Sequence, residues 1–215
     1  MRKKKWAIPE LKACSYYVEN PDKNLCQLFK RPNPIHLEIG CGKGVFTSEI
    51  SLKNKDINYI GIDLSTDVLG VCRRNIEKKY SLAGKEIDNI LIMCYNAGNL
   101  MDVFKENSVD RIYLNFSNPW SKKKHHKRRL TYPSMLKIYE KILKPNSKIF
   151  FKTDDENLFE DSIGYFNSTN FKIEKLTYDL HSENLNDESS ILTEHELMFL
   201  KENKKIKFLS ANLIK

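Results

Sequence analysis

The sequence predicts an α/β fold in which a mostly parallel sheet of seven strands has helices on both faces. Short apolar segments alternate with segments whose apolar residues recur at helical spacing. A glycine cluster follows the first apolar segment, and an aspartate ends the second. No long helical segment separates the last two apolar segments, residues 171–180 and 206–213, so we expect the last strand to be antiparallel.

The first part of the expected sheet has three strands and two connecting helices. Val, Ile, Leu and Tyr dominate its strands, and glycine or aspartate ends the first two of them. A serine or threonine before an apolar stripe marks the start of the second helix. The expected elements are strand 35–39, helix 45–52, strand 58–62, a helix that Ser65 or Thr66 can cap, and strand 89–94.

The second part follows the same alternation until its last two strands. Each connecting segment has apolar residues at helical spacing and polar residues between them. The expected elements are strand 111–116, helix 132–143, strand 148–152, helix 156–166, strand 171–180 and strand 206–213.

The 215 residues suit a single domain with one sizeable core. We expect a basic N-terminal extension over 1–33, where prolines interrupt the chain, and one domain over 34–215. No run approaches the roughly 20 apolar residues of a membrane helix, and no apolar run follows the basic N-terminus, so neither a membrane protein nor a secretory signal is expected. The five cysteines lack C-x-x-C spacing, which favours a cytoplasmic protein without a metal site.

The net charge is +8, with 36 Lys and Arg against 28 Asp and Glu. An excess of positive charge favours a polyanionic partner, because displaced counterions drive binding to phosphates. A generally lysine-rich composition would give the same total. The position of the charges is therefore better evidence for a polyanionic partner than their sum.

The segment after the first strand, residues 38–44 (EIGCGKG), predicts a ligand loop. Glycines let the backbone turn tightly and approach a ligand, and the following helix offers free N–H groups. Its third glycine comes one residue too early for a nicotinamide-binding loop. Glu38 would repel a pyrophosphate and suits a ligand with a cationic group, such as the amino acid end of S-adenosylmethionine.

Asp63 stands at the end of the second strand, about 23 residues beyond Gly40. A carboxylate at this place can accept both ribose hydroxyls of an adenosine. An ordinary turn with an incidental Asp is the alternative. The succession of strand, glycine loop, helix, strand and terminal acid favours the nucleoside site. This part of the sequence resembles the class I S-adenosylmethionine-dependent methyltransferases.

A second block narrows the resemblance. Residues 113–131 (YLNFSNPWSKKKHHKRRLT) resemble the tRNA (guanine-N7-)-methyltransferase family, whose signature is a phenylalanine, Asp-Pro-Trp and then K/R-x-x-H-x-K-R-R. Three further motifs match in order: 151–154 (FKTD), 179–181 (DLH) and 193–196 (TEHE). The resemblance runs from about residue 34 to the C-terminus, and it is specific because several separated motifs agree.

The resemblance implies a Rossmann-like class I methyltransferase fold and a bacterial, single-subunit enzyme. It implies methyl transfer from S-adenosylmethionine to N7 of a guanine in tRNA, guanine 46 of the variable loop. It further implies no obligatory protein subunit, a monomer or homodimer, and a cytoplasmic location. The candidate cofactor-binding residues are Glu38, Gly40, Gly42, Gly44, Asp63, Asn96 and Asn118.

The candidate substrate-binding residues are Lys122, Asp154, Thr193, Glu194, His195 and Glu196. A carboxylate can accept the N1–H and N2–H₂ donors of guanine and so select it over adenine. Thr193 and Glu196 also have the spacing of a helix capping box, which is a purely structural alternative. We expect His181 to be structural and His36 to be a partly buried core residue.

The basic run over 122–129 has six Lys or Arg among eight residues and adjoins the candidate catalytic strand. A solvated charged loop is the alternative to phosphate contact. Either Arg in the run could instead pair with a buried acid. Trp120 either lines the base pocket or belongs to the core, and its place after a loop proline favours the pocket. The predicted phosphate contacts are Lys123, Lys124, Lys127, Arg128 and Arg129.

The sequence departs from the family pattern at three positions. Asn118 and Asn96 stand where Asp is usual, and His195 replaces a frequent Tyr. Asn118 is the catalytic candidate, and an amide cannot act as a base near neutral pH. N7 of guanine has a free lone pair and needs no proton removed. We therefore expect Asn118 to orient the base or the cofactor by hydrogen bonding.

Two other functions fit parts of the sequence. Asn-Pro-Trp is similar to the (Asn/Asp)-Pro-Pro-(Tyr/Phe) loop of amino-methyltransferases, but it has one proline and a downstream His-x-Lys-Arg-Arg. The two Asp-to-Asn differences would also suit a non-catalytic RNA-binding protein on a methyltransferase scaffold. Such a protein would still bind S-adenosylhomocysteine if Glu38, the glycine loop and Asp63 were intact.

Overall fold

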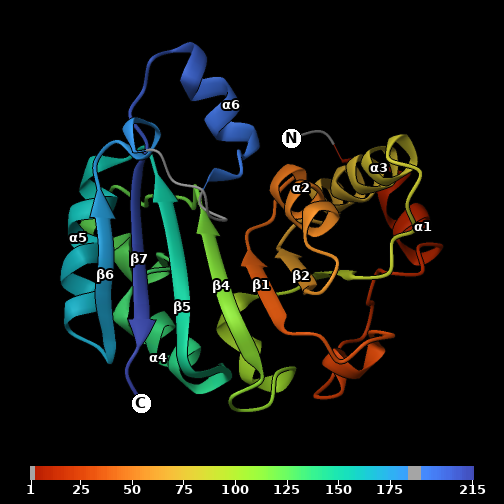
Figure 1. Cartoon of the computed structure of the whole chain (residues 1–215), viewed down its shortest axis with the longest axis horizontal. Coiled ribbons are helices and arrows are strands. Elements are labelled where there is room, and N and C mark those ends of the chain that lie inside the picture. The colour runs from red at the N-terminus through yellow and green to blue at the C-terminus, as the bar shows by residue number, and fades with distance from the viewer. Residues whose placement is uncertain (1–2, 184–189) are drawn as a thin grey trace. The chain divides into compact units, whose positions relative to one another are not determined.

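The computed structural model describes residues 3–183 and 190–215 (Figure 1). The chain forms two compact units, Met1–Phe104 and Lys105–Lys215. Seven strands make up the sheet in the order β3-β2-β1-β4-β5-β7-β6. The parallel pairs and the antiparallel last strand confirm the predicted α/β class.

The first unit is built on three parallel strands. They are β1 (Ile35–Ile39), β2 (Asn58–Asp63) and β3 (Ile90–Cys94), joined by helices α2 (Val45–Lys53) and α3 (Thr66–Leu82). Ser65 caps α3 by accepting a hydrogen bond from the Val68 N–H, one of the two caps that the sequence predicted. Pairing of Asp63 with Cys94 brings the carboxyl ends of β2 and β3 to one edge. A short 3₁₀ helix, η2 (Ala97–Asp102), follows β3.

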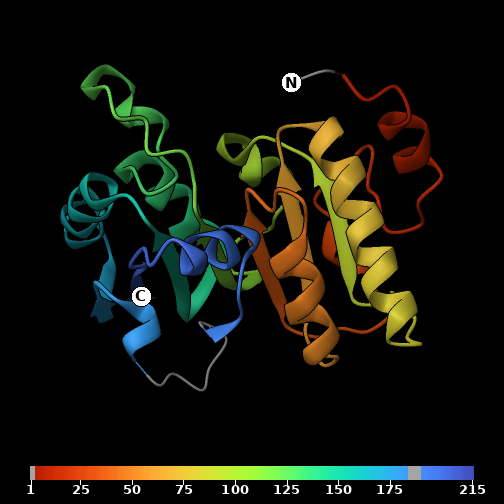
Figure 2. The same cartoon turned by 90° about the horizontal axis from the view of Figure 1, so that it is seen from above.

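The N-terminal segment packs within this unit. It contains α1 (Ala7–Lys12) and a 3₁₀ helix, η1 (Leu25–Leu28). Figure 2 shows α3 between α2 and α1, and Ala7 of α1 lies so close to Gly70 that a side chain on that glycine would clash. Tyr17 bridges to Ile92 at the edge of β3. The predicted boundary at residue 33 stays a prediction, and residues 1 and 2 of the expected extension lie outside the described residues.

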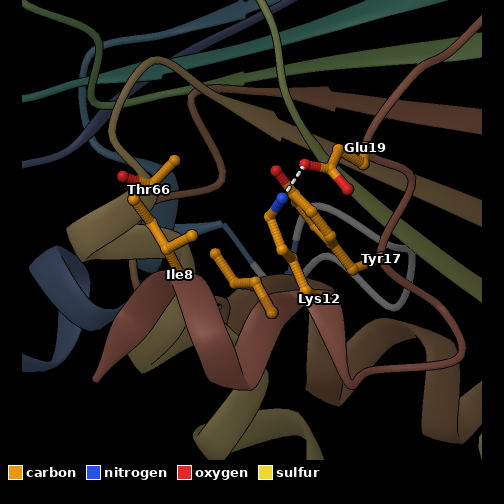
Figure 3. Close-up of a pocket in the computed structure, with 6 residues that line it drawn as sticks. Ile8, Lys12, Tyr17, Glu19 and Thr66 are labelled. Carbon is orange, nitrogen blue, oxygen red and sulfur yellow. Dashed lines mark ion pairs between the residues drawn. The ribbon is translucent and has the colours of Figure 1, made fainter. Parts of the chain in front are cut away.

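A small pocket lies beside α1, lined by α1, the segment after it and the first turn of α3 (Figure 3). Lys12 and Glu19 form an ion pair across it at 2.6 Å. Both side chains are about half exposed, so water screens the pair and it stabilises little. Tyr17 and Thr66 complete the polar part of the lining.

The second unit contains β4 (Val109–Asn115), β5 (Leu143–Thr153), β6 (Phe171–Thr177) and β7 (Lys207–Leu213). β4 and β5 are parallel, whereas β7 runs opposite to both β5 and β6 (Figure 1). Its described residues also form α4 (Pro133–Ile142), α5 (Glu156–Asn167), α6 (Glu194–Lys201), and the 3₁₀ helices η3 (Lys123–Arg128) and η4 (Leu180–Ser182).

Aromatic contacts fill the core of the second unit. Phe150 meets the ring of Phe208 edge-on at 5.5 Å, and Phe151 stacks near Phe159 at 6.2 Å. Such pairs join β5 to β7 and to α5. The described residues contain no helix long and apolar enough to cross a membrane. α6 was not expected from the sequence, and β5 begins five residues before its predicted start at 148.

Candidate active site

The loop after β1, Gly40–Gly44, turns on three glycines with positive φ: 81° at Gly40, 55° at Gly42 and 72° at Gly44. A Cβ on Gly44 would overlap the sulfur of Cys72, whereas a Cβ on Gly40 would meet open space. The N–H groups of Gly40 and Cys41 donate to the Ile62 carbonyl at 2.8 and 3.0 Å. The loop is therefore anchored to β2, and open space remains beside Gly40.

Cys41 lies between the first two glycines of this loop and is buried. Its hydrogen bond with Cys72, followed by burial, raises the pKa of the Cys41 thiol well above its ordinary value. A protonated thiol is a poor nucleophile, so Cys41 acts here as a packing residue. Glu38 is also buried and accepts a hydrogen bond from the Thr47 hydroxyl of α2.

Asp63 ties the end of β2 to the glycine loop. One oxygen of its carboxylate accepts from Gly42 N–H at 3.1 Å, and the other accepts from Ser65 N–H at 3.0 Å. A carboxylate has about four acceptor positions, so these two bonds leave capacity for two hydroxyl donors. Asp63 is only half-buried, in contrast to Glu38.

Asn96 follows β3 at the same edge as the end of β2. Its side-chain oxygen accepts from Gly98 N–H at 2.9 Å and caps η2, and its side chain is exposed. The parallel strands of the first unit thus present Gly40–Gly44, Asp63 and Asn96 at their carboxyl ends, where ligands of open α/β sheets bind.

The loop after β4, Phe116–Trp120, is the central feature of the second unit. Asn118 is exposed, and its side-chain oxygen accepts from the Trp120 N–H at 3.0 Å. Phe116 and Trp120 have positive φ values of 50° and 45°, which are costly for aromatic residues by about 1 to 3 kcal/mol each. Strain of this kind persists where the surroundings fix it and is concentrated at functional loops.

Trp120 is half-buried and does not belong to the core, and its position in a base pocket stays a prediction. The Arg128 guanidinium lies over its ring at 5.0 Å, and His125 meets it edge-on at 5.7 Å. Most of the basic run forms η3, which Lys122 precedes, and the exposed side chains are those of Lys122, Lys123, Lys124, Lys127 and Arg128.

Arg129 differs from the rest of the basic run because its side chain is only 1% exposed. Its guanidinium donates to the Asp161 carboxylate at 2.5 Å and to the Pro119 carbonyl at 2.7 Å. Arg129 therefore pairs with an acid, which was the alternative role that the sequence allowed. The predicted phosphate contact of Arg129 is wrong, because its charge faces the Asn118 loop and α5.

α6 begins with the capping box that the spacing of Thr193 and Glu196 allowed. The Thr193 hydroxyl accepts from Glu196 N–H at 3.1 Å, and the Glu196 carboxylate accepts from Thr193 N–H at 2.9 Å. Both Glu196 oxygens also accept from the Lys152 ammonium at 3.0 Å. Because Glu196 is fully buried, contact with a base would require this ion pair to open. Substrate binding by Thr193 and Glu196 stays a prediction.

Asp154, Glu194 and His195 are further accessible candidates of the second unit. Asp154 follows β5 and is partly exposed, and its carbonyl accepts from the Lys207 ammonium at 3.2 Å. Glu194 is partly exposed and His195 is exposed in the first turn of α6. His181 lies 3.6 Å from Glu196, which agrees with its expected structural role.

Comparisons with known proteins show the family to which this chain belongs. A family model described as "Putative methyltransferase" matches residues 32–209. A protein of Clostridium botulinum (strain Eklund 17B / Type B), named tRNA (guanine-N(7)-)-methyltransferase, is 49% identical over 98% of this chain and 97% of its own. A protein of the same name from Clostridium beijerinckii is 46% identical over the same shares. The chain belongs to the tRNA (guanine-N(7)-)-methyltransferase family.

Solved structures support the fold of this methyltransferase family member. "Structure of an Antibiotic Related Methyltransferase" has a TM-score of 0.62 at 15% identity and covers 91% of this chain and 96% of the other. The 16S rRNA methyltransferase KamB has a TM-score of 0.62 at 10% identity, covering 100% and 96%. At these identities they show the fold alone, which is the Rossmann-like methyltransferase fold that the sequence predicted.

Three residues at the methyltransferase site were not assigned a role from the sequence. Lys152 directly follows three apolar residues of β5, 149–151, and a lysine in a buried part of a strand signals a buried partner. Phe116 was known only as part of a motif, and its positive φ is a property of the folded loop. Asp161 is one of the polar residues between the apolar positions of α5, and nothing close to it in the sequence indicates that it binds Arg129.

Proposed function

We propose that the protein transfers a methyl group from S-adenosylmethionine to N7 of a guanine in tRNA, namely guanine 46 of the variable loop. The main support is the relative named tRNA (guanine-N(7)-)-methyltransferase, which is 49% identical along almost its whole length. The glycine loop and Asp63 supply the donor site. The loop carrying Asn118, with the basic η3, supplies the acceptor site. We propose further that the enzyme works in the cytoplasm without another protein subunit.

The residues of the first unit suit S-adenosylmethionine. Gly40 leaves open space for a ligand, Asp63 keeps acceptor capacity for ribose hydroxyls, and Glu38 supplies negative charge next to the loop. When bound, S-adenosylmethionine supplies a methyl group on a positively charged sulfur, which a nitrogen lone pair can take. Asn96 provides an amide at the end of β3 for the adenine side of the nucleoside.

The residues of the second unit suit a guanine without a general base. N7 of neutral guanine has a free lone pair, so alignment is the main task of the protein. Asn118 orients the base or the donor through hydrogen bonds. Asp154 and Glu194 offer accessible carboxylates for the N1–H and N2–H₂ donors of guanine, and the exposed lysines of η3 offer phosphate contacts.

Nucleoside analysis tests the proposal directly. Unmodified tRNA is incubated with the protein and isotopically labelled S-adenosylmethionine, digested and examined by mass spectrometry, and the labelled position is mapped by sequencing. Labelled 7-methylguanosine at position 46 is the expected result. A label on an exocyclic amine would indicate an amino-methyltransferase. Bound S-adenosylhomocysteine without any transfer would indicate a non-catalytic RNA-binding protein.

Replacing Asp63 with alanine is expected to weaken S-adenosylmethionine binding by about 2 to 3 kcal/mol, because two hydroxyls lose a charged acceptor. Titration calorimetry measures the change. Asp56→Ala is the matched control, since Asp56 is an exposed aspartate just before the amino end of β2. Thermal melting checks that the loss of the Gly42 contact leaves the protein folded. Equal affinities of the Asp63→Ala protein and the wild type would remove Asp63 from the site.

Replacing Lys124 and Lys127 together with alanine is expected to weaken tRNA binding and to flatten its dependence on salt. The slope of log K against log salt should fall by roughly one for each lost phosphate contact. Arg128 and Arg129 stay unchanged because both have contacts within the protein. The control removes the same charge from the exposed Lys78 and Lys85 of the first unit. Identical slopes for the two double variants would contradict phosphate contact by η3.

A further inference from the structure

Two aromatic rings from distant parts of the second unit are stacked beside the Asn118 loop. Phe116 stands directly after β4, and His195 stands in the first turn of α6. Their ring centroids are 5.5 Å apart with an interplanar angle of 16°. Phe199, one turn further along α6, packs against both rings at an angle. The stack therefore joins the candidate catalytic loop to α6.

The backbone of Phe116 is held in a conformation that does not suit its side chain. Its φ of 50° lies in the left-handed region, where glycine or asparagine would be cheaper. The Phe116 N–H donates to the Lys152 carbonyl at 2.9 Å, which fixes the turn. An aromatic ring kept at a strained position points to a role for the ring itself.

Lys152 positions both members of the stack. Its backbone carbonyl holds Phe116, and its side-chain ammonium binds the carboxylate of Glu196, the residue next to His195. The ammonium also donates to the Ile191 carbonyl at 3.0 Å, just before α6. Since Lys152 and Glu196 are almost completely buried, this link is rigid. The two rings thus belong to one fixed assembly.

Exposure distinguishes the two rings. Phe116 is half-buried, and its stacking partner His195 is exposed. The imidazole occupies the outer position, so His195 is the ring of the pair that a ligand can reach. An exposed planar ring backed by a second ring is the usual arrangement of a surface on which an unpaired base stacks.

We propose that His195, backed by Phe116, is the stacking surface for the guanine that is methylated. This inference rests on the proposed function. Methylation of N7 uses the lone pair of that nitrogen, so the purine becomes positively charged. The negative face of an aromatic ring attracts such a cation more than it attracts the neutral base. The stack therefore aligns the guanine and favours the charged product side of the reaction.

Single-turnover methyl transfer tests the stacking surface. His195→Ala is expected to lower the rate at subsaturating tRNA by about 10- to 100-fold, in the range of the loss of one stacked base. His195→Tyr should restore most of the rate, because a tyrosine ring can stack without an imidazole nitrogen. Leu197→Ala is the control, because Leu197 is an exposed side chain of the same helix.

Phe116 is tested by Phe116→Leu, which keeps an apolar side chain and removes the ring. Its rate should fall while its melting temperature and its affinity for S-adenosylhomocysteine remain close to those of the wild type. Combining it with His195→Ala should add little further loss, since both residues serve one stack. If the Phe116→Leu variant fails to fold, the rates of the His195 variants test the stacking surface without it.

The outcomes separate this inference from the proposed function. A wild-type protein that puts no methyl on guanine N7 would overturn both. An active wild type with an equally active His195→Ala variant would overturn the stacking surface only. An inactive His195→Tyr variant would show that His195 acts through its nitrogens, which also contradicts stacking.

Discussion

Replacing Asn118 with alanine is expected to slow single-turnover methyl transfer by about 100-fold, the effect of a misplacement of roughly 1 Å at a reacting centre. The Asn118 side chain accepts from the Trp120 N–H and so fixes a loop whose two aromatic residues have positive φ. Alanine removes this acceptor and also the amide donor. The loop can then relax, and the base is no longer held in line.

Asn118→Asp is expected to keep activity or to raise it. Aspartate keeps the acceptor for the Trp120 N–H, and its negative charge attracts a positively charged donor. An amide does not titrate near neutral pH, so the wild-type rate should show no ionisation belonging to this position. Rates measured at saturating tRNA between about pH 6 and 9 check both statements.

A substitution at a neighbouring residue tests whether the rate loss is specific to Asn118 or follows from any change in this loop. Ser121→Ala removes a hydroxyl from an exposed residue directly after Trp120, and we expect its rate to equal that of the wild type. Trp120 fluorescence reports whether the loop has moved in each variant. A wild-type rate in Asn118→Ala would remove the positioning role. Turnover in Asn118→Asp alone would mean that the natural chain is not catalytic.

Local signals explain which parts of the fold were predictable. β1, the glycine loop, β2 and Asp63 are specified by residues close together in the chain, and their observed bounds differ little from the predicted ones. The helix caps at Ser65 and Thr193 are likewise local, because each cap binds an N–H three residues away. β5 extends further back than expected because the residues after Leu143, KPNS, are mostly polar and resemble a turn.

The missed and corrected parts depend on partners distant in sequence. α6 has four consecutive apolar residues, 197–200, which show no helical period, so the helix was not predicted although its capping box was recognised. In the sequence, Arg129 looks like one more cation of the basic run. Only the fold brings it to Asp161, which is 32 positions away. Lys152 and Glu196 are separated by 44 positions, and no periodicity relates them.

Breaking the buried ion pair of Lys152 and Glu196 is expected to destabilise the second unit strongly. Replacing Lys152 with methionine should lower the free energy of unfolding by about 3 to 5 kcal/mol, because it leaves the Glu196 carboxylate buried without its cation. The side chains are 2% and 0% exposed, so water cannot replace the lost partner. Urea unfolding with an unchanged m-value measures the loss.

The double variant Lys152→Met with Glu196→Leu distinguishes an unpaired charge from a lost contact. It removes both charges, so it should be more stable than Lys152→Met alone, although the cap of Thr193 is lost with Glu196. Lys144→Met is the matched control, since the Lys144 pair with Asp110 is partly exposed and should cost less than about 1 kcal/mol. A Lys152→Met protein as stable as the Lys144→Met protein would contradict this account. It would also remove the link that holds Phe116 and His195 together, because that link depends on a buried pair that is strong and rigid.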